Sequence, residues 1–291
     1  MSQEQQTPHK RRVRYKGKYP KKFEEKYKEL QPEKYQETVE HVIRKGNTPA
    51  GMHISIMVKE ILDFLDIQPG QTGFDATLGY GGHTKAMLEC LKGQGHIYAT
   101  DVDPEESAKT KKRLEEQGFG EKILTVCLQN FCTIDEIAEK VGGFDFILAD
   151  LGVSSMQIDN PKRGFSFKAD GPLDLRLNQE KGISAAERLD TISREELAGM
   201  LYENSDEPYC EELAKAITDE IRRGNRIDTT TKLRNVIEKT LSFLPDNKEK
   251  KDIVKKTCQR TFQALRIDVN NEFEVLYEFM EKLPDALRPG G

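Results

Sequence analysis

A glycine-rich segment at residues 74–84 constrains the fold more than any other part of the chain. Its sequence, FDATLGYGGHT, predicts a buried strand that ends in a tight turn and leads directly into a helix over 84–91. Glycine lets a ligand approach the backbone closely, and the first turn of a helix has free N–H groups. A second strand, 96–100, ends at Asp101, about 20 residues beyond Gly79, which is typical of an acid that binds ribose hydroxyls. The segment therefore predicts a βαβ unit that binds an adenosine-containing cofactor.

The residues around the turn favour a methyl donor over a nicotinamide. The dinucleotide fingerprint places a third glycine where this chain has Thr84. Asp75 lies inside the first strand just before the turn, and a carboxylate there suits the ammonium and sulfonium groups of S-adenosylmethionine. Two alternatives stay open on this pattern, which are a tight strand-to-helix turn without a ligand and a nicotinamide oxidoreductase.

The composition is that of a charge-rich protein without a membrane-spanning or secretory segment. The chain has 291 residues, of which 36% are hydrophobic and 33% charged, and this length allows one large domain or two modest ones. No apolar run approaches the roughly 18 residues that a membrane helix needs, and the N-terminus is too polar for a secretory signal. The five cysteines form no CxxC pair, so we expect neither a disulfide framework nor a metal site, and a reducing cytoplasm fits.

The first 50 residues carry an excess of positive charge, whereas the whole chain has a net charge of −5. Between Lys10 and Lys22 every charged residue is basic, and Tyr15 and Tyr19 lie among them. Such a tract can neutralise phosphates and stack on unpaired bases, and a disordered solubilising arm explains it equally well. A linker over 46–51 separates this arm from the globular part.

Strands and helices alternate after an amphipathic helix at 54–65. The expected strands are 74–78, 96–100, 123–128 and 144–149, and the expected helices between them are 84–91, 104–117 and 133–140. This alternation predicts a parallel, doubly wound sheet with ligands at the carboxyl ends of its strands. From about residue 160 the pattern becomes helical, with expected helices at 184–189, 193–202, 208–223, 230–241, 248–265 and 268–287.

Six motifs resemble one known family, the MraW/RsmH methyltransferases that act on cytosine N4 in 16S ribosomal RNA. In order between Met52 and Gly291, they are DATLGYGGHT, DVDP, DLGVSSMQID, RGFSF, DGPLDLR and TFQALRIDVN. The resemblance implies an α/β, Rossmann-like class I S-adenosylmethionine-dependent methyltransferase with an inserted helical accessory domain. It also implies methylation of the exocyclic N4 of a cytosine in small-subunit ribosomal RNA near the decoding centre. A non-catalytic ribosome-assembly factor that keeps the cofactor fold is the alternative.

The resemblance also implies how the chain divides into domains. We expect a basic arm at 1–51, the first part of the methyltransferase domain at 52–159, a helical accessory domain at 160–258 and a return to the methyltransferase domain at 259–291. Met156 stands where the family usually has proline, and the basic arm lies outside the shared region. The family continues past the final Pro-Gly-Gly with another strand and a Ser-Phe-His-Ser-Leu-Glu-Asp motif, so the chain resembles a truncated member.

Cofactor contacts are implied by the same resemblance. They map onto Gly81, Gly82, His83, Asp101, Phe131, Asp150 and Gln157. Asp150 is also our candidate catalytic residue, because an amine that accepts a methyl group must lose a proton, and a purely structural or cofactor-binding role for it remains open. Asp103, followed by Pro104, is the expected N-cap of helix 104–117.

The expected substrate contacts lie in the long loop after the fourth strand. Arg163, Phe165 and Phe167 suit a loop that faces RNA, where an unpaired base stacks on an aromatic ring. A hydrophobic clasp between the two domains would use the same phenylalanines. The expected partner is 16S ribosomal RNA within the small ribosomal subunit, with no membrane partner, and a homodimer remains open.

Overall fold

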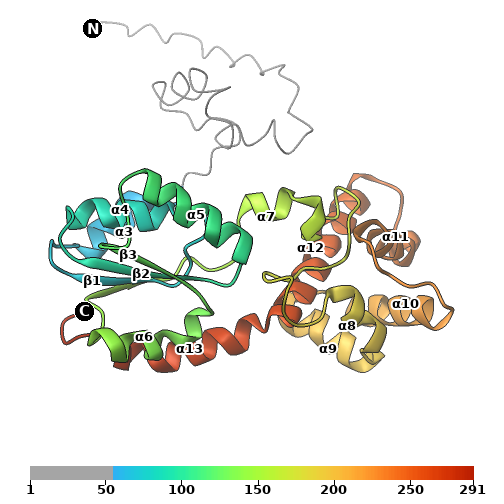
Figure 1. The fold of residues 1–291 in the computed structure, drawn as a ribbon. Coiled ribbons are helices and arrows are strands. Elements are labelled where there is room, and N and C mark those ends of the chain that lie inside the picture. The colour runs from blue at the N-terminus through green and yellow to red at the C-terminus, as the bar shows by residue number, and fades with distance from the viewer. Residues whose placement is uncertain (1–54) are drawn as a thin grey trace, which may run out of the picture. The chain divides into compact units, whose positions relative to one another are not determined.

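The computed structural model describes residues 55–291, and the basic arm predicted at 1–51 lies outside these described residues. A parallel four-stranded sheet with the order β3-β2-β1-β4 is the centre of the first part of the described chain (Figure 1). Its strands are β1 (Thr72–Asp75), β2 (His96–Asp101), β3 (Leu124–Leu128) and β4 (Phe146–Leu148). All four strands were predicted, and the parallel doubly wound arrangement is confirmed.

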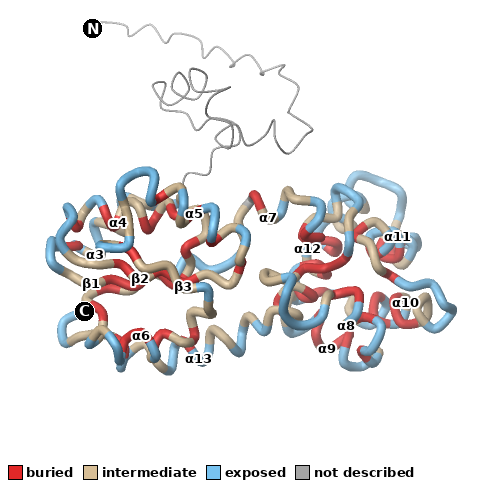
Figure 2. Tube along the Cα trace, viewed as in Figure 1, coloured by how far each residue is buried: buried red, intermediate tan, exposed pale blue. Residues whose placement is uncertain are grey.

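Helices cover both faces of the sheet (Figure 1). One face carries α3 (Val58–Leu65), α4 (Gly82–Leu91) and α5 (Pro104–Glu116), and the other carries α6 (Ile134–Val141) and α13 (Glu272–Ala286). Each face has its own hydrophobic cluster, one around Met87 and Leu91 of α4 and the other around Phe74 and Phe144. Buried residues accordingly follow the strands and the inner faces of the helices (Figure 2).

The remaining helices form a separate cluster between β4 and α13. They are α7 (Ser155–Asp159), α8 (Ala185–Thr191), α9 (Arg194–Ser205), α10 (Cys210–Arg222), α11 (Thr230–Thr240) and α12 (Lys248–Asn270), with short 3₁₀ turns at Pro161–Arg163 and Leu241–Phe243. Another 3₁₀ turn, Phe131–Thr133, lies between β3 and α6. Their hydrophobic core includes Phe165 and reaches Leu265, so packing in this cluster continues past the boundary expected at 258. The division into an accessory domain and a returning segment stays a proposal.

Side-chain caps explain where several elements begin. Asp103 accepts hydrogen bonds from the backbone N–H groups of Glu105 and Glu106, which confirms it as the N-cap of α5. The strand expected over 74–78 ends at Asp75, where the carboxylate of Asp75 accepts the N–H of Thr77. The N–H groups of Ala76 and Leu78 still donate to carbonyl oxygens of β4 and β2.

Two helices were placed imperfectly from the sequence. Helix α7 was not predicted, although Ser154 and Gln157 form a capping box at its start. Helix α12 runs five residues beyond its predicted end at 265, to Asn270, because only at Asn271 does the backbone enter the left-handed region, with φ 49°. Among residues 55–291 every helix is too short or too polar to span a membrane, and the five cysteines are free thiols.

Close packing between two strands fixes the position of β4. Gly73 of β1 pairs with Phe146 of β4, and a Cβ atom at Gly73 would lie 2.1 Å from the Phe146 ring. The ring therefore occupies the space that any larger residue at position 73 would need, and it joins the cluster beneath α4.

We expect Gly73→Ala to lower the free energy of unfolding by about 3 kcal/mol, because the ring must move out of a close-packed core. Chemical denaturation of the wild type and the variant measures the difference. Gly120→Ala is the matched control, since no atom lies within 4 Å of a Cβ there. Equal losses in the two variants would contradict the packing argument.

Candidate active site

A crevice of about 450 Å³ opens at the carboxyl ends of β1, β2 and β4. One wall comes from the glycine turn and the loops after β2 and β4, and the other comes from α12 and the start of α13. The crevice brings together all the predicted cofactor contacts, which are Gly81, Gly82, His83, Asp101, Phe131, Asp150 and Gln157. The cofactor roles of these residues stay predictions.

The glycine turn lies between β1 and α4, and its packing requires residues without a Cβ atom. Gly81 has φ 77° and is the N-cap of α4, and a Cβ there would lie 2.7 Å from Thr110 of α5. A Cβ at Gly82 would lie 2.1 Å from the hydroxyl oxygen of Ser55. The turn thus packs tightly against two neighbouring segments while its backbone lines the crevice.

Asp101 connects this turn to the end of β2. One carboxylate oxygen accepts the N–H of Gly79 at 2.8 Å, and the other accepts the N–H of Asp103 at 2.9 Å. Burial raises the pKa of Asp101, although these backbone hydrogen bonds oppose the shift. A carboxylate can accept about four hydrogen bonds, so Asp101 keeps acceptor capacity toward the crevice, which suits ribose hydroxyls.

Asp75 lies beneath the turn with its side chain almost completely buried. Its carboxylate accepts hydrogen bonds from the Thr84 hydroxyl at 2.6 Å and from the N–H of Thr77 at 3.0 Å. Burial raises its pKa to about 7, and the nearby charges of Asp101 and Asp150 add to this shift, while the two hydrogen bonds oppose it. Three acids therefore meet at this edge of the sheet, where a cationic ligand would relieve their repulsion.

Asp150 follows β4 and faces His83 across the turn. Its side chain is 46% exposed, and its carboxylate lies 3.4 Å from Nε2 of the buried His83. The backbone N–H of Asp150 donates to the Thr77 hydroxyl at 2.9 Å, which fixes the loop against β1. Nε2 of His83 has no hydrogen-bond partner in the described part of the chain, and the Asp150 carboxylate lies beside it without forming one.

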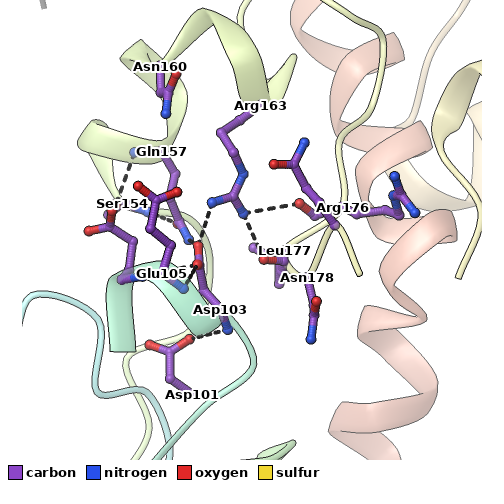
Figure 3. Close-up of polar contacts among 12 residues, drawn as sticks. Asp101, Asp103, Glu105, Ser154, Gln157, Asn160, Arg163, Arg176, Leu177 and Asn178 are labelled. Carbon is purple, nitrogen blue, oxygen red and sulfur yellow. Dashed lines mark hydrogen bonds and ion pairs between the residues drawn. The ribbon is translucent and has the colours of Figure 1, made fainter. Parts of the chain in front are cut away.

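A fourth carboxylate of this region, Asp103, forms a buried ion pair with Arg163 (Figure 3). The Arg163 guanidinium donates to Asp103 at 2.6 Å, and the Gln157 side-chain amide donates to the same oxygen at 3.0 Å. Arg163 also donates to the carbonyl oxygen of Leu177 at 2.7 Å. These contacts connect the start of α5 to the long loop between β4 and α8.

The structure corrects two expectations about that loop. Arg163 is 5% exposed and Phe165 is 8% exposed, so both are buried instead of standing open in a surface loop, although Phe165 also lines a small hollow beside α12. The Arg163 guanidinium neutralises the buried Asp103 carboxylate, and Phe165 belongs to the core of the helical cluster. Phe167 is partly buried and packs edge-on against Phe262 of α12, with ring centroids 5.7 Å apart. Of the three predicted substrate contacts, Phe167 alone keeps a partly open position.

Residues of α12 were missed as contributors to the crevice. Gln263, Arg266 and Asn270 line it from one face of the helix. Asn270 accepts the N–H of Leu177 and donates to the carbonyl of Leu175, both at 2.8 Å, so it also orders the loop that Arg163 holds. Their spacing of three and four residues inside the TFQALRIDVN motif is a helical-face signal that sequence reasoning had available.

The parallel sheet, the glycine turn and the neighbouring acids define an α/β protein of the kind that binds a nucleoside-containing cofactor. A model of the MraW methylase family matches residues 50–291, and the chain belongs to this family. Membership of a methylase family confirms S-adenosylmethionine as the expected cofactor. The acidic crevice fits its positive charge.

Relatives of known name agree with the family. The chain is 84% identical over its whole length to "Ribosomal RNA small subunit methyltransferase H 1" of Agathobacter rectalis and covers 82% of that protein. It is 69% identical to the protein of the same name from Lachnoclostridium phytofermentans, over 100% of this chain and 79% of the relative. "Ribosomal RNA small subunit methyltransferase H" of Fusobacterium nucleatum is 38% identical over 82% of this chain and 73% of its own length. The first two matches include the basic arm, although the family model begins only at residue 50.

We expect Arg163→Met to lower the free energy of unfolding by about 3 kcal/mol, because it leaves the buried Asp103 carboxylate without its cation. Denaturant titration measures this loss. Arg226→Met is the control, since the Arg226–Asp190 pair is largely exposed and its removal should hardly change the midpoint. The double variant Asp103→Asn/Arg163→Met should recover part of the stability, and a double variant no more stable than Arg163→Met would contradict the charge argument.

The raised pKa of Asp75 predicts that the stability of the protein depends on pH. Its pKa rises from 3.8 in the unfolded chain to about 7 in the folded protein, so the folded state binds more protons between these values. Its contribution to stability is therefore complete below pH 4 and is lost as the pH rises toward 7, by at most about 1.4 kcal/mol per pH unit. We expect Asp75→Asn to remove this slope in denaturation curves recorded from pH 4 to 8. Parallel curves for wild type and variant would refute the assignment.

Proposed function

We propose that this protein uses S-adenosylmethionine to methylate the exocyclic N4 amine of a cytosine in 16S ribosomal RNA, near the decoding centre of the small subunit. One observation carries the proposal: three neighbouring strand ends bring Asp101, the glycine turn and Asp150 to a single crevice. The names of the relatives support ribosomal RNA of the small subunit as the substrate. They favour an enzyme over a non-catalytic assembly factor.

The cofactor side of the crevice uses Asp101 and the glycine turn. Asp101 would accept hydrogen bonds from ribose hydroxyls, since its backbone contacts leave acceptor capacity on both oxygens. The backbone around Gly81 and Gly82 permits close approach, and Phe131 lines the same space beside β3. Bound S-adenosylmethionine supplies a methyl group activated by its sulfonium charge.

The substrate side of the crevice uses Asp150. The lone pair of the cytosine amine is delocalised into the ring, so the amine reacts well only when its proton can leave as the new N–C bond forms. The Asp150 carboxylate is partly open to the crevice and has His83 as its close neighbour. Asp150 would hold the amine by a hydrogen bond and accept its proton, which then passes to solvent.

We expect Asp101→Ala and Asp150→Ala to affect different steps. Loss of hydrogen bonds to a charged group should weaken S-adenosylmethionine binding about tenfold to a hundredfold in Asp101→Ala. Asp150→Ala should lower kcat about a hundredfold or more while cofactor affinity changes little. Titration calorimetry gives the affinity, and tritium transfer to unmethylated small subunits gives kcat.

Asp63→Ala is the matched control for both variants, because Asp63 is exposed on α3 and does not line the crevice. It should change neither quantity. Unchanged cofactor affinity in Asp101→Ala would refute the ribose assignment. Full turnover in Asp150→Ala would remove this residue from the methyl-transfer step.

A further inference from the structure

A face of α12 rich in lysine has no role in the function described so far. The spacing of its members places them on one side of the helix: Lys248, Asp252, Lys255, Lys256, Gln259, Gln263 and Arg266. All of these except Arg266 are exposed, and Arg266 is partly buried. From Lys248 to Gln263 the face extends over about 22 Å of helix.

The lysines of this face are not used in ion pairs. Within residues 55–291, neither Lys248, Lys255 nor Lys256 lies within ion-pair distance of a carboxylate, even though Asp252 is four residues from two of them. Helix α5 shows the opposite pattern, since its lysines each pair with a glutamate three or four residues away. Positive charge on α12 is thus available to a partner, whereas on α5 it is neutralised.

A second hollow connects this face to the crevice. It has a volume of about 230 Å³ and shares Val153, Gln263 and Arg266 with the wall of the crevice. Phe167, Lys168 and Gln259 line its other sides. Lys255 lies one helical turn before Gln259, so amides, an aromatic ring and lysines follow one another outward from the crevice.

We propose that the lysine face of α12, together with the second hollow, binds the single-stranded RNA that flanks the target nucleotide. The proposal rests on the proposed function, because it takes RNA as the substrate of the crevice. Phosphates would lie along Lys255 and Lys256, and the side-chain amides of Gln259 and Gln263 would face bases. Single strands are bound in this way, by a positively charged path with an aromatic ring for stacking.

The salt dependence of RNA binding tests the proposal. Affinity of the full chain for unmethylated small subunits is measured over a range of KCl concentrations, for the wild type and for Lys255→Gln/Lys256→Gln. Each lost phosphate contact should lower the slope of log affinity against log salt by about 0.7, or about 1.4 for the pair. At low salt we expect a tenfold or greater loss of affinity, with an unchanged dissociation constant for S-adenosylmethionine and unchanged kcat at saturating subunits.

The matched control is Lys122→Gln/Lys140→Gln. These two lysines are exposed near the start of β3 and the end of α6, at the edge of the sheet opposite the crevice. Asp252→Lys is a second test, because it adds positive charge to the face and should tighten binding, which a folding defect cannot imitate. If Lys255→Gln/Lys256→Gln matches the control in slope and affinity, the lysine face is not an RNA site.

The outcomes separate this proposal from the proposed function. A wild type that methylates the subunits while the Lys255→Gln/Lys256→Gln variant behaves as the control would overturn the lysine face alone. A wild type that transfers no methyl group, but whose binding loses the expected slope in the variant, would overturn the proposed function and support the RNA site.

Discussion

The Asp103 carboxylate joins parts of the chain that are far apart in sequence. It caps α5 through two backbone N–H groups, accepts the Gln157 amide and pairs with Arg163. The backbone N–H of Asp103 donates to the Asp101 carboxylate, which also accepts the N–H of Gly79 in the glycine turn. Arg163 also donates to the carbonyl oxygen of Leu177, and the N–H of Leu177 donates to the side chain of Asn270 in α12. A buried charge pair thereby links the two walls of the crevice, in addition to the direct continuation of α12 into α13, which packs against the sheet part.

Three acidic side chains lie close together at the edge of the crevice that this network borders. Asp75, Asp101 and Asp150 belong to adjacent strand ends, and burial raises the pKa of the first two. Repulsion between these acids lowers the stability of the free protein, so the arrangement suits a site that binds a cation. Thr84 stands where a dinucleotide fold would have glycine, and its hydroxyl binds Asp75, which explains why this turn departs from the dinucleotide pattern.

Local signals in the sequence were sufficient for the sheet and for choosing residues that the structure brings to one crevice. Alternating strands and helices gave the topology, and the spacing from Gly79 to Asp101 indicated an acid beside the glycine turn, where the structure places it. The errors arose where long-range pairing decides a side chain's position. Arg163 was expected at the surface because its neighbours are polar, yet its partner lies 60 residues away in Asp103. The α12 wall was missed because the spacing of Gln263, Arg266 and Asn270 places them on one face of a helix but does not show that this face meets the sheet edge.

The distribution of charge also limits how RNA can enter the proposed complex. The acids at the strand ends repel phosphates, whereas the lysine face of α12 attracts them, and the two regions share the wall formed by Gln263 and Arg266. The Arg266 guanidinium is itself neutralised by Glu272, at 2.7 and 3.0 Å, so this wall offers little net charge to a backbone. A neutral base can pass it while its phosphates stay outside. In the proposed complex the target cytosine would therefore leave its stack to reach Asp150, while the sugar-phosphate backbone would stay on α12.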